Sequence, residues 1–448
     1  MVLHSALTRD VLILIINGLP FREAAATSVV CPEMRDIWTS SKNIELNESF
    51  FLKKNRAASD QIEAFIHFVE RFLELYQEPH VVTLKVLFSH SEQYPNLMTS
   101  CIRFSVNHKT RHLTHEFADT VLVENHLEIS GECLNLPTDF YNHKHLESLT
   151  LAACKVEPSH LGSFGVLKEL SLVLMDFQIS DLPRLLSACK FLESLTLKRC
   201  SFVCLAVSSH KLGTLLVDEC SVFDSEIMID TPNLKYLKYT GPVPTYIQNA
   251  EGLEELNLNL GMEYESYDRL VIDRTVIYDI LSKLRPNRAL TVSSYMIQAF
   301  STRRESVSLS PPLTVRHLTL NIGRHYNEEK GIQFFLSSCP RLETLSIEVG
   351  PGRKYQDYVC PSKLNSQQIW TRAFECITPT LRVVEFKGYR DRMYEHSLLM
   401  YLLKHGNVLE AITVITANTH RDLTTHKLRL KKYLHGVTSS RHLHIAVL

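Results

Sequence analysis

A short pattern of apolar residues, here called the frame, recurs through the middle of the chain. One apolar residue is followed by two variable residues and then by two apolar residues with a single residue between them. Such alternation predicts a short β-strand, because successive side chains of a strand point to opposite faces. The first apolar position of the frame is occupied by Leu146, Leu167, Leu192, Leu212, Leu234, Leu253, Val315 and Leu342.

The early copies of the frame lie about 19 to 25 residues apart, which is the length of a leucine-rich repeat. A degenerate copy near Leu290 follows apolar residues at helical spacing. Further copies near Val81, Leu381 and Leu409 extend the array toward both ends. We therefore predict an α/β leucine-rich-repeat solenoid, with a parallel sheet on the concave face and helices on the convex face.

The first 40 residues or so show a helical pattern instead. Thr8 is placed to cap a helix whose apolar residues cover one broad face as far as Leu19, and Pro20 ends that helix. Residues 21–31 predict a second helix, and residues 34–38 predict a short third one. Three helices this short cannot bury so many apolar residues among themselves. We therefore expect an intermolecular interface, since each large side chain left in water forgoes roughly 1.5 to 3 kcal/mol.

One amphipathic helix is predicted between this segment and the repeats. Apolar residues from Ile62 to Tyr76 recur at helical spacing, with Asp60 near the start and Pro79 after the end. We expect its apolar face to pack on the first repeat and to fix the N-terminal segment relative to the array. A coiled-coil partner is the alternative, although two heptads are too few for one.

The N-terminal residues resemble an F-box in order and spacing. The matching positions form L-x-x-D-V-L-x-x-I-I-x-x-L-P, then A-x-x-S-V-V, then R-D-I-W. An F-box followed by leucine-rich repeats is similar to the plant F-box/LRR family, whose members join an SCF ubiquitin ligase through a Skp-type adaptor and hold a substrate with the repeats. The resemblance implies adaptor contacts at Leu7, Val11, Leu12, Ile15, Ile16, Leu19, Pro20, Val29, Val30, Met34, Ile37 and Trp38.

The segment from Leu381 to Ile415 resembles the FBD segment that closes many plant members of this family. A terminal repeat must also shield the core of a solenoid from water, so we expect this region to cap the array. The expected domains are an F-box over residues 1–45, a linker helix over 46–79, leucine-rich repeats over 80–379 and an FBD-like capping region over 380–448.

Composition excludes several other classes of protein. The 448 residues carry 48 basic and 49 acidic side chains, so nucleic-acid binding has little electrostatic support. The apolar run Val11–Ile16 is too short for a signal peptide or a membrane span. The 11 cysteines form no CxxC pair, which indicates reduced thiols. We expect a soluble protein of the cytoplasm, the nucleus or both.

No catalytic or cofactor motif is present, so we predict neither an enzyme nor a bound metal or cofactor. His108, His112 and His115 have a spacing that could hold zinc, but no fourth ligand accompanies them. Cys154, Cys200 and Cys220 each follow a predicted strand by three residues, where a small buried thiol can pack under the turn.

Strand alternation also predicts which side chains line the concave face. That face is polar and mixed in sign, which suits a protein substrate, although a solvated sheet has the same composition. The candidate substrate-binding residues are Glu169, Thr196, Lys198, Asp218, Tyr236, Lys238, Glu255, Asn257, His317 and Glu348.

Two alternatives remain open at the level of the sequence. One is a repeat scaffold with a degenerate F-box, because Glu33 and Met34 stand where the family carries a basic residue and Trp. The other is a small-molecule-gated F-box/LRR receptor, which needs a concave cluster of Arg and Lys where this chain has only Lys198 and Lys238. A basic cluster at Arg429, Lys431 and Lys432 is more simply a solvated helix face.

Overall fold

The protein is described by a computed structural model whose residues fall into two compact units. Unit 1 comprises Met1–Leu212 and Cys220–Glu226, and unit 2 comprises Gly213–Glu219 and Ile227–Leu448. The structure describes residues 8–30, 34–51, 57–90, 93–116, 134–157, 164–224, 226–244, 246–247, 250, 252–260, 274–300, 308–323, 328–350, 370, 374–417, 423–437 and 443–448.

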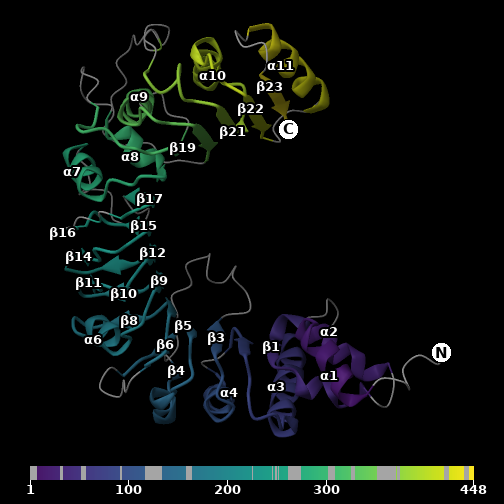
Figure 1. The fold of residues 1–448 in the computed structure, drawn as a ribbon. Helices are drawn as coiled ribbons and strands as arrows, with labels where there is room; N and C mark the ends of the chain where they lie inside the picture. Colours follow the sequence, from purple (N-terminus) through teal and green to yellow (C-terminus); the bar gives the residue numbers. More distant parts are fainter. Residues whose placement is uncertain are drawn as a thin grey trace. The chain divides into compact units, whose positions relative to one another are not determined.

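Unit 1 contains a parallel sheet in which chain neighbours are sheet neighbours (Figure 1). The strands, in order across the sheet, are β1 (Asn43–Asn47), β2 (Thr83–Leu87), β3 (His112–Glu116), β5 (Ser148–Ala152), β7 (Glu169–Val173) and β9 (Ser194–Lys198). The frame that predicted a strand in each repeat is confirmed, since its apolar pairs point inward and are buried.

Short strands and helices complete each repeat of unit 1. The short strands are β4 (Leu134–Asn135), β6 (Cys154–Lys155), β8 (Asp176–Phe177), β10 (Ser201–Phe202), β11 (Leu205–Ser208) and β13 (Ser221–Val222). The helices are α3 (Ala58–Leu75), α4 (Pro95–Asn107) and α6 (Asp181–Ala188), with 3₁₀ turns η4 (Glu48–Phe51) and η5 (Thr138–Asn142). The N-terminal helices are α1 (Arg9–Asn17), α2 (Phe21–Ala26), η1 (Thr27–Val29) and η3 (Ile37–Ser40).

The chain leaves strands β5, β7 and β9 through residues in the left-handed backbone region, Ala153, Leu174 and Arg199. Arg199, with φ of 51°, ends β9 and is followed by buried Cys200, whose thiol donates to the Leu172 carbonyl at 3.3 Å. The thiols of Cys154 and Cys220 likewise donate to backbone carbonyls. The predicted packing of these cysteines under the turns is confirmed.

Helix α3 joins the N-terminal helices to the first repeats through aromatic contacts. The Phe72 ring lies 5.3 Å from that of Phe21 on α2 and 5.4 Å from Trp38 on η3, between ring centroids. On its other side it approaches Tyr76 at 5.6 Å and Phe104 of α4 at 6.4 Å. The prediction that this helix packs on the first repeat and holds the N-terminal segment is confirmed.

Unit 2 has the same architecture of a parallel sheet with helices. Its parallel sheet runs through β12 (Thr214–Asp218), β15 (Tyr236–Gly241), β17 (Glu255–Leu260), β18 (Ala289–Val292), β19 (His317–Ile322), β20 (Thr344–Val349), β21 (Val383–Tyr389), β22 (Ala411–Thr416) and β23 (His444–Val447). Its other elements are β14 (Ile227–Asp230), β16 (Tyr246–Ile247), α7 (Arg274–Leu284), α8 (Ser294–Gln298), α9 (Glu329–Ser338), α10 (Met393–His405) and α11 (Leu423–Val437). The predicted degenerate repeat is confirmed as α7 followed by β18.

Basic and acidic residues alternate at many of the positions just before successive strands, although Arg288 and Arg316 are neighbours there. Their backbones lie side by side, as when Glu343 N–H donates to the Arg316 carbonyl and Arg382 N–H to the Glu343 carbonyl. Each exposed ion pair contributes at most about 1 kcal/mol to stability. The ion pairs are Arg111–Glu147 in unit 1, and Lys235–Glu254, Arg316–Glu343 and Arg382–Glu410 in unit 2.

Some elements differ from the predicted ones. The second N-terminal helix ends at Ala26 instead of residue 31, because the Thr27 and Ser28 hydroxyls donate to carbonyls three residues back and the chain tightens into a 3₁₀ turn. Strand β1 falls across the expected boundary between F-box and linker and pairs with β2. Strand β23 was not predicted.

Candidate functional site

The N-terminal helices of unit 1 form a small core of their own. Its buried residues are Leu12, Ile16, Ala24, Met34 and Ile37, with Ile13, Leu19 and Trp38 packed against it. Four residues expected at the adaptor interface, Leu12, Ile16, Met34 and Ile37, therefore hold these helices together in the described arrangement. The expectation that the helices cannot bury such residues is wrong for these four, because helical spacing brings Leu12 and Ile16 onto one inner face.

Other apolar side chains of the same helices face solvent. Val11 is 39 % exposed and Ile15 44 % on α1, while Val29 at the end of η1 is 87 % exposed and Val30 59 %. Leu14, which the sequence analysis did not single out, is 72 % exposed. Helix α1 is thus apolar on both its inner and its outer face. A helix that is apolar all round has a second surface to bury.

The remaining predicted adaptor residues divide between these two groups. Pro20 is exposed, and Leu19 is half-buried at the small core. Trp38 is half-buried because its indole stacks on Phe68 and Phe72 of α3. Leu7 lies outside the described residues.

The outward strand face of unit 1 is lined by small hydroxyl side chains and a few charges. Thr114, Thr150, Ser171 and Thr196 stand side by side on β3, β5, β7 and β9. Glu169 is exposed in the neighbouring row, and Lys198 is half-buried beside Val173. The alternation therefore places all three predicted substrate residues of unit 1, Glu169, Thr196 and Lys198, on the outward face.

Ion pairs occupy much of the outward strand face of unit 2. The Lys238 ammonium lies 3.1 Å from the Asp218 carboxylate on the neighbouring strand. Glu255 lies 3.4 Å from the Arg288 guanidinium, and Glu348 lies 2.9 Å from Lys387. Tyr236, in register with Glu255, and Asn257, in register with Lys238, are half-buried, and His317 is exposed.

Sequence reasoning identified both Lys238 and Asp218 but missed Arg288 and Lys387, the partners of Glu255 and Glu348. Lys387 also lies 3.4 Å from Glu385, and its hydrogen bond to Glu348 raises the pKa of the ammonium. Lys387 follows the apolar pair of its repeat as Lys198 does, so the frame could have placed it. Arg288 precedes a degenerate strand, and only the register of β17 against β18 brings it to Glu255.

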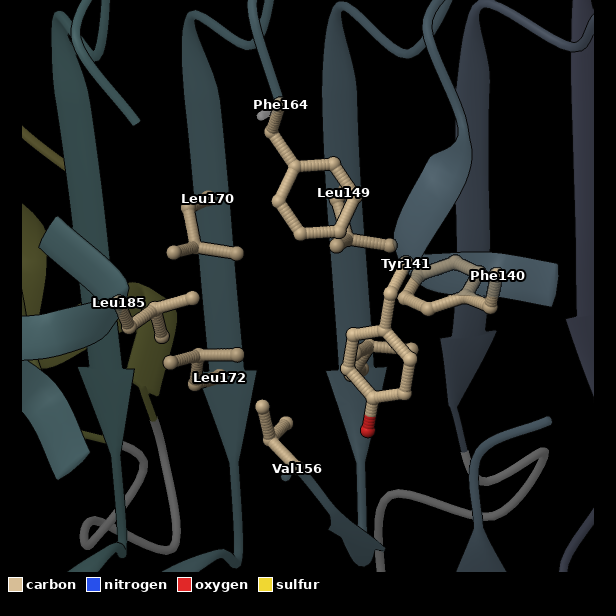
Figure 2. A pocket seen from close by; sticks show the side chains of 9 residues that line it. Phe140, Tyr141, Leu149, Val156, Phe164, Leu170, Leu172 and Leu185 are labelled. Atoms are coloured by element: carbon tan, nitrogen blue, oxygen red, sulfur yellow. The ribbon is translucent and has the colours of Figure 1, made fainter. Parts of the chain in front are cut away.

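An apolar cavity lies inside unit 1, beneath β5 and β7 (Figure 2). Phe140, Phe164 and Leu185 close it on the side away from the strands. The Tyr141 hydroxyl is satisfied, because it accepts the Glu157 N–H at 2.8 Å. The space amounts to about one water molecule. This cavity is a gap in core packing and not a ligand pocket.

The histidines with zinc-like spacing are separated by the strand alternation. His112 points outward from β3, whereas His115 points into the core. The Nε2 atom of His115 lies 3.2 Å from the Met98 sulfur and its Nδ1 atom 3.5 Å from the Cys154 sulfur. Within the described residues, no group of three or more His, Cys, Asp or Glu side chains is arranged to hold a metal ion.

Burial lowers the pKa of His115 from 6.5 to about 4, so unit 1 should lose stability in acid. Between these two values the unfolded chain binds a proton that the folded chain does not, and stability falls as the pH falls. Linkage gives a loss of about 2 kcal/mol between pH 7 and pH 5 from this residue. The measurement is urea unfolding of the wild type and His115→Gln at both pH values.

His115→Gln should reduce that acid loss by about 2 kcal/mol. His112→Gln, an outward-facing change on the same strand, is the matched control and should retain the loss. A residual slope is expected in both variants, because burial also lowers the pKa of His143. An unchanged pH difference in His115→Gln would contradict the prediction.

Among the described helices, none is long and apolar enough to span a membrane. Comparison with known protein families finds a separate match for each of two parts of the chain. Residues 5–46 match the F-box domain, and residues 80–439 match the family model described as At1g61320/AtMIF1, LRR domain.

The chain is similar along most of its length to several proteins of Arabidopsis thaliana. It is 26% identical to F-box protein At3g62230, over 91% of this chain and 90% of that one. It is 24% identical to FBD-associated F-box protein At1g66310 and to F-box/LRR-repeat protein 13, in each case over 89% of this chain and 86% of the relative. The two family models match the segments that form the N-terminal helices and the repeat array, and the relatives cover most of the chain. The chain therefore belongs to the plant F-box/LRR-repeat family that includes FBD-associated members.

Proposed function

We propose that this chain is the substrate-recognition subunit of an SCF-type ubiquitin ligase. The observation that carries the proposal is the outer apolar face of the F-box, where Leu14 and Val29 are 72 % and 87 % exposed although the helices already have a core. Burying two such side chains in a Skp-type adaptor would contribute roughly 3 to 6 kcal/mol. The adaptor would link the chain to a cullin.

The strand faces of the two units are the proposed surfaces for a protein substrate. Parallel strands present polar side chains in regular rows, and the rows hold exposed Glu169 in unit 1 and exposed His317 in unit 2. The Lys238 and Lys387 ammonium groups are paired with carboxylates, so the face as described suits a polypeptide better than a polyanionic small molecule. Ubiquitin transfer would be the work of other subunits, in the cytoplasm or the nucleus.

Leu14→Asp combined with Val29→Asp should abolish association with a Skp-type adaptor, weakening it at least about 100-fold. Both side chains face solvent, so the free chain should keep its fold. Co-expression with the adaptor, followed by affinity purification and a binding titration, provides the measurement. Leu12→Asp is unsuitable because Leu12 lies in the core of the F-box.

The control charges two exposed apolar residues elsewhere in unit 1, Ile179→Asp and Phe223→Asp, which are 61 % and 74 % exposed in the wild type. It should bind the adaptor as the wild type does. Equal adaptor binding by both double variants would refute the proposed interface. A folded wild type that does not bind the adaptor at all would favour a repeat scaffold with a degenerate F-box.

A further inference from the structure

Helix α11 of unit 2 carries basic side chains that no described carboxylate neutralises. Residues 423–437 contain Lys427, Arg429, Lys431 and Lys432 and no Asp or Glu. The last three are exposed, and Lys427 is half-buried. Between described residues, the ion pairs of unit 2 involve other elements only.

The orientation of α11 determines where these charges point. Leu430 and Leu434 are buried, which directs that face of the helix into the unit, where α11 packs on β23. The Tyr433 ring lies 5.3 Å from the His396 ring, so the Tyr433 side faces α10. A helix turns about 100° per residue, which places Lys431 and His435 on the side away from α10.

Five side chains follow this outer side of the helix and are here named the basic stripe. The basic stripe consists of Lys427, Leu428, Lys431, Lys432 and His435. Leu428, near its N-terminal end, is 65 % exposed. The stripe therefore combines an apolar side chain in water with three lysines that form no ion pair with a described carboxylate, in a chain whose net charge is −1.

The contrast with the rest of the unit gives the stripe its significance. Along the sheet edge, Lys235, Arg316 and Arg382 each have an acidic partner one strand away. On the strand face, Lys238 and Lys387 are paired as well. The lysines of α11 have no such carboxylate partner among the described residues, so their charges are available to an external anion.

We propose that the basic stripe binds an acidic polypeptide segment of a partner protein, with Leu428 contacting an apolar residue of that segment. The stripe runs about 12 Å from Lys427 to His435, at 1.5 Å per helical residue. That length matches about four residues of extended chain. Carboxylates at alternate positions of such a segment can reach the ammonium groups of Lys431 and Lys432.

The packing of α11 favours a polypeptide over a membrane. An interfacial helix inserts its apolar face among lipids, but the apolar face of α11 is occupied because Leu430 and Leu434 pack into the unit. Only Leu428 would enter the bilayer from the basic stripe. A nucleic acid is disfavoured by the short stripe and the overall charge of the chain.

The test is a fluorescence anisotropy titration of the full chain with a labelled peptide of about eight Asp and Glu residues around one central Leu. Lys431→Glu combined with Lys432→Glu should weaken binding at least about tenfold, and added salt should weaken the wild type. Leu428→Ser should weaken it about threefold to tenfold. Lys190→Glu with Lys211→Glu, the same charge change at two exposed lysines of unit 1, should have less than about a twofold effect.

Four outcomes would overturn the inference. They are no wild-type binding at about 1 mM peptide, equal binding of a peptide with Gln and Asn in place of Glu and Asp, equal losses in the α11 and control variants, and binding of phosphatidylserine vesicles without binding of the peptide. Adaptor association should be unchanged in Lys431→Glu with Lys432→Glu. Peptide binding therefore tests the basic stripe, and adaptor association tests the proposed ligase role, so either proposal can be refuted without the other.

Discussion

Gly331→Ala is expected to lower the stability of unit 2 by about 3 to 5 kcal/mol. Gly331 lies in α9 where that helix crosses α8, and a Cβ atom there would lie 2.7 Å from the carbonyl carbon of Ile297 and closer still to its oxygen. Both helices must separate, because the obstacle is backbone and cannot rotate away. Thermal and urea unfolding followed by circular dichroism measures the loss, which corresponds to a fall of about 10 °C in Tm.

Gly436 provides a control of the same chemical change in the same unit. It also lies within a helix, α11, but nothing stands within 4 Å of a Cβ built there. Gly436→Ala should stabilise the chain by about 0.5 to 1 kcal/mol, because alanine loses less backbone entropy on forming a helix. Equal effects of the two substitutions would contradict the close helix contact.

The repeat array could be predicted from the sequence because its strands obey a strict local rule. Leu149 and Leu151 of β5 are buried, and Leu170 and Leu172 of β7 follow them in register. Each inward pair is separated by one outward residue, so two-residue alternation determines which side chains form the core. The same rule placed the outward candidates of both units.

The strands at the two ends escaped this rule for a physical reason. The leading apolar residue of the frame is replaced by Ser41 before Ile44 and Leu46 of β1, and by His442 before Ile445 and Val447 of β23. A terminal strand has one neighbour, so it needs fewer apolar residues than a central one. Its sequence is correspondingly less regular.

The F-box surface was predicted only in part, because a helix with apolar residues on every side does not reveal which side is the inner one. Leu12 and Ile16 face inward, while Leu14 and Ile15 face outward, and hydrophobicity alone does not separate them. The separation comes from where Met34 and Ile37 pack, which is a tertiary contact. The paired charges of the strand face depend similarly on inter-strand register.

Phe72→Ala is expected to lower the stability of unit 1 by about 3 to 5 kcal/mol and to release the F-box from the first repeats. Phe72 is 1 % exposed and is the ring that contacts both parts, through Phe21 and Trp38 on one side and Phe104 on the other. Removing the ring leaves a cavity between the two groups of helices. Urea unfolding measures the stability, and amide hydrogen exchange in α1 measures the release.

Leu75→Ala on the same helix is the matched control, because Leu75 is 47 % exposed and should cost less than about 1 kcal/mol. Phe72→Leu keeps part of the side-chain volume, so its loss of stability should lie between those of Phe72→Ala and Leu75→Ala. If amide exchange in α1 accelerates in Phe72→Ala alone, the aromatic contacts of Phe72 fix the orientation of the F-box relative to the first repeats. Unchanged exchange in α1, together with a loss of stability below about 1 kcal/mol, would show that the F-box is held to the repeats by other contacts, such as the hydrogen bond that the Tyr76 hydroxyl donates to the Ser41 carbonyl.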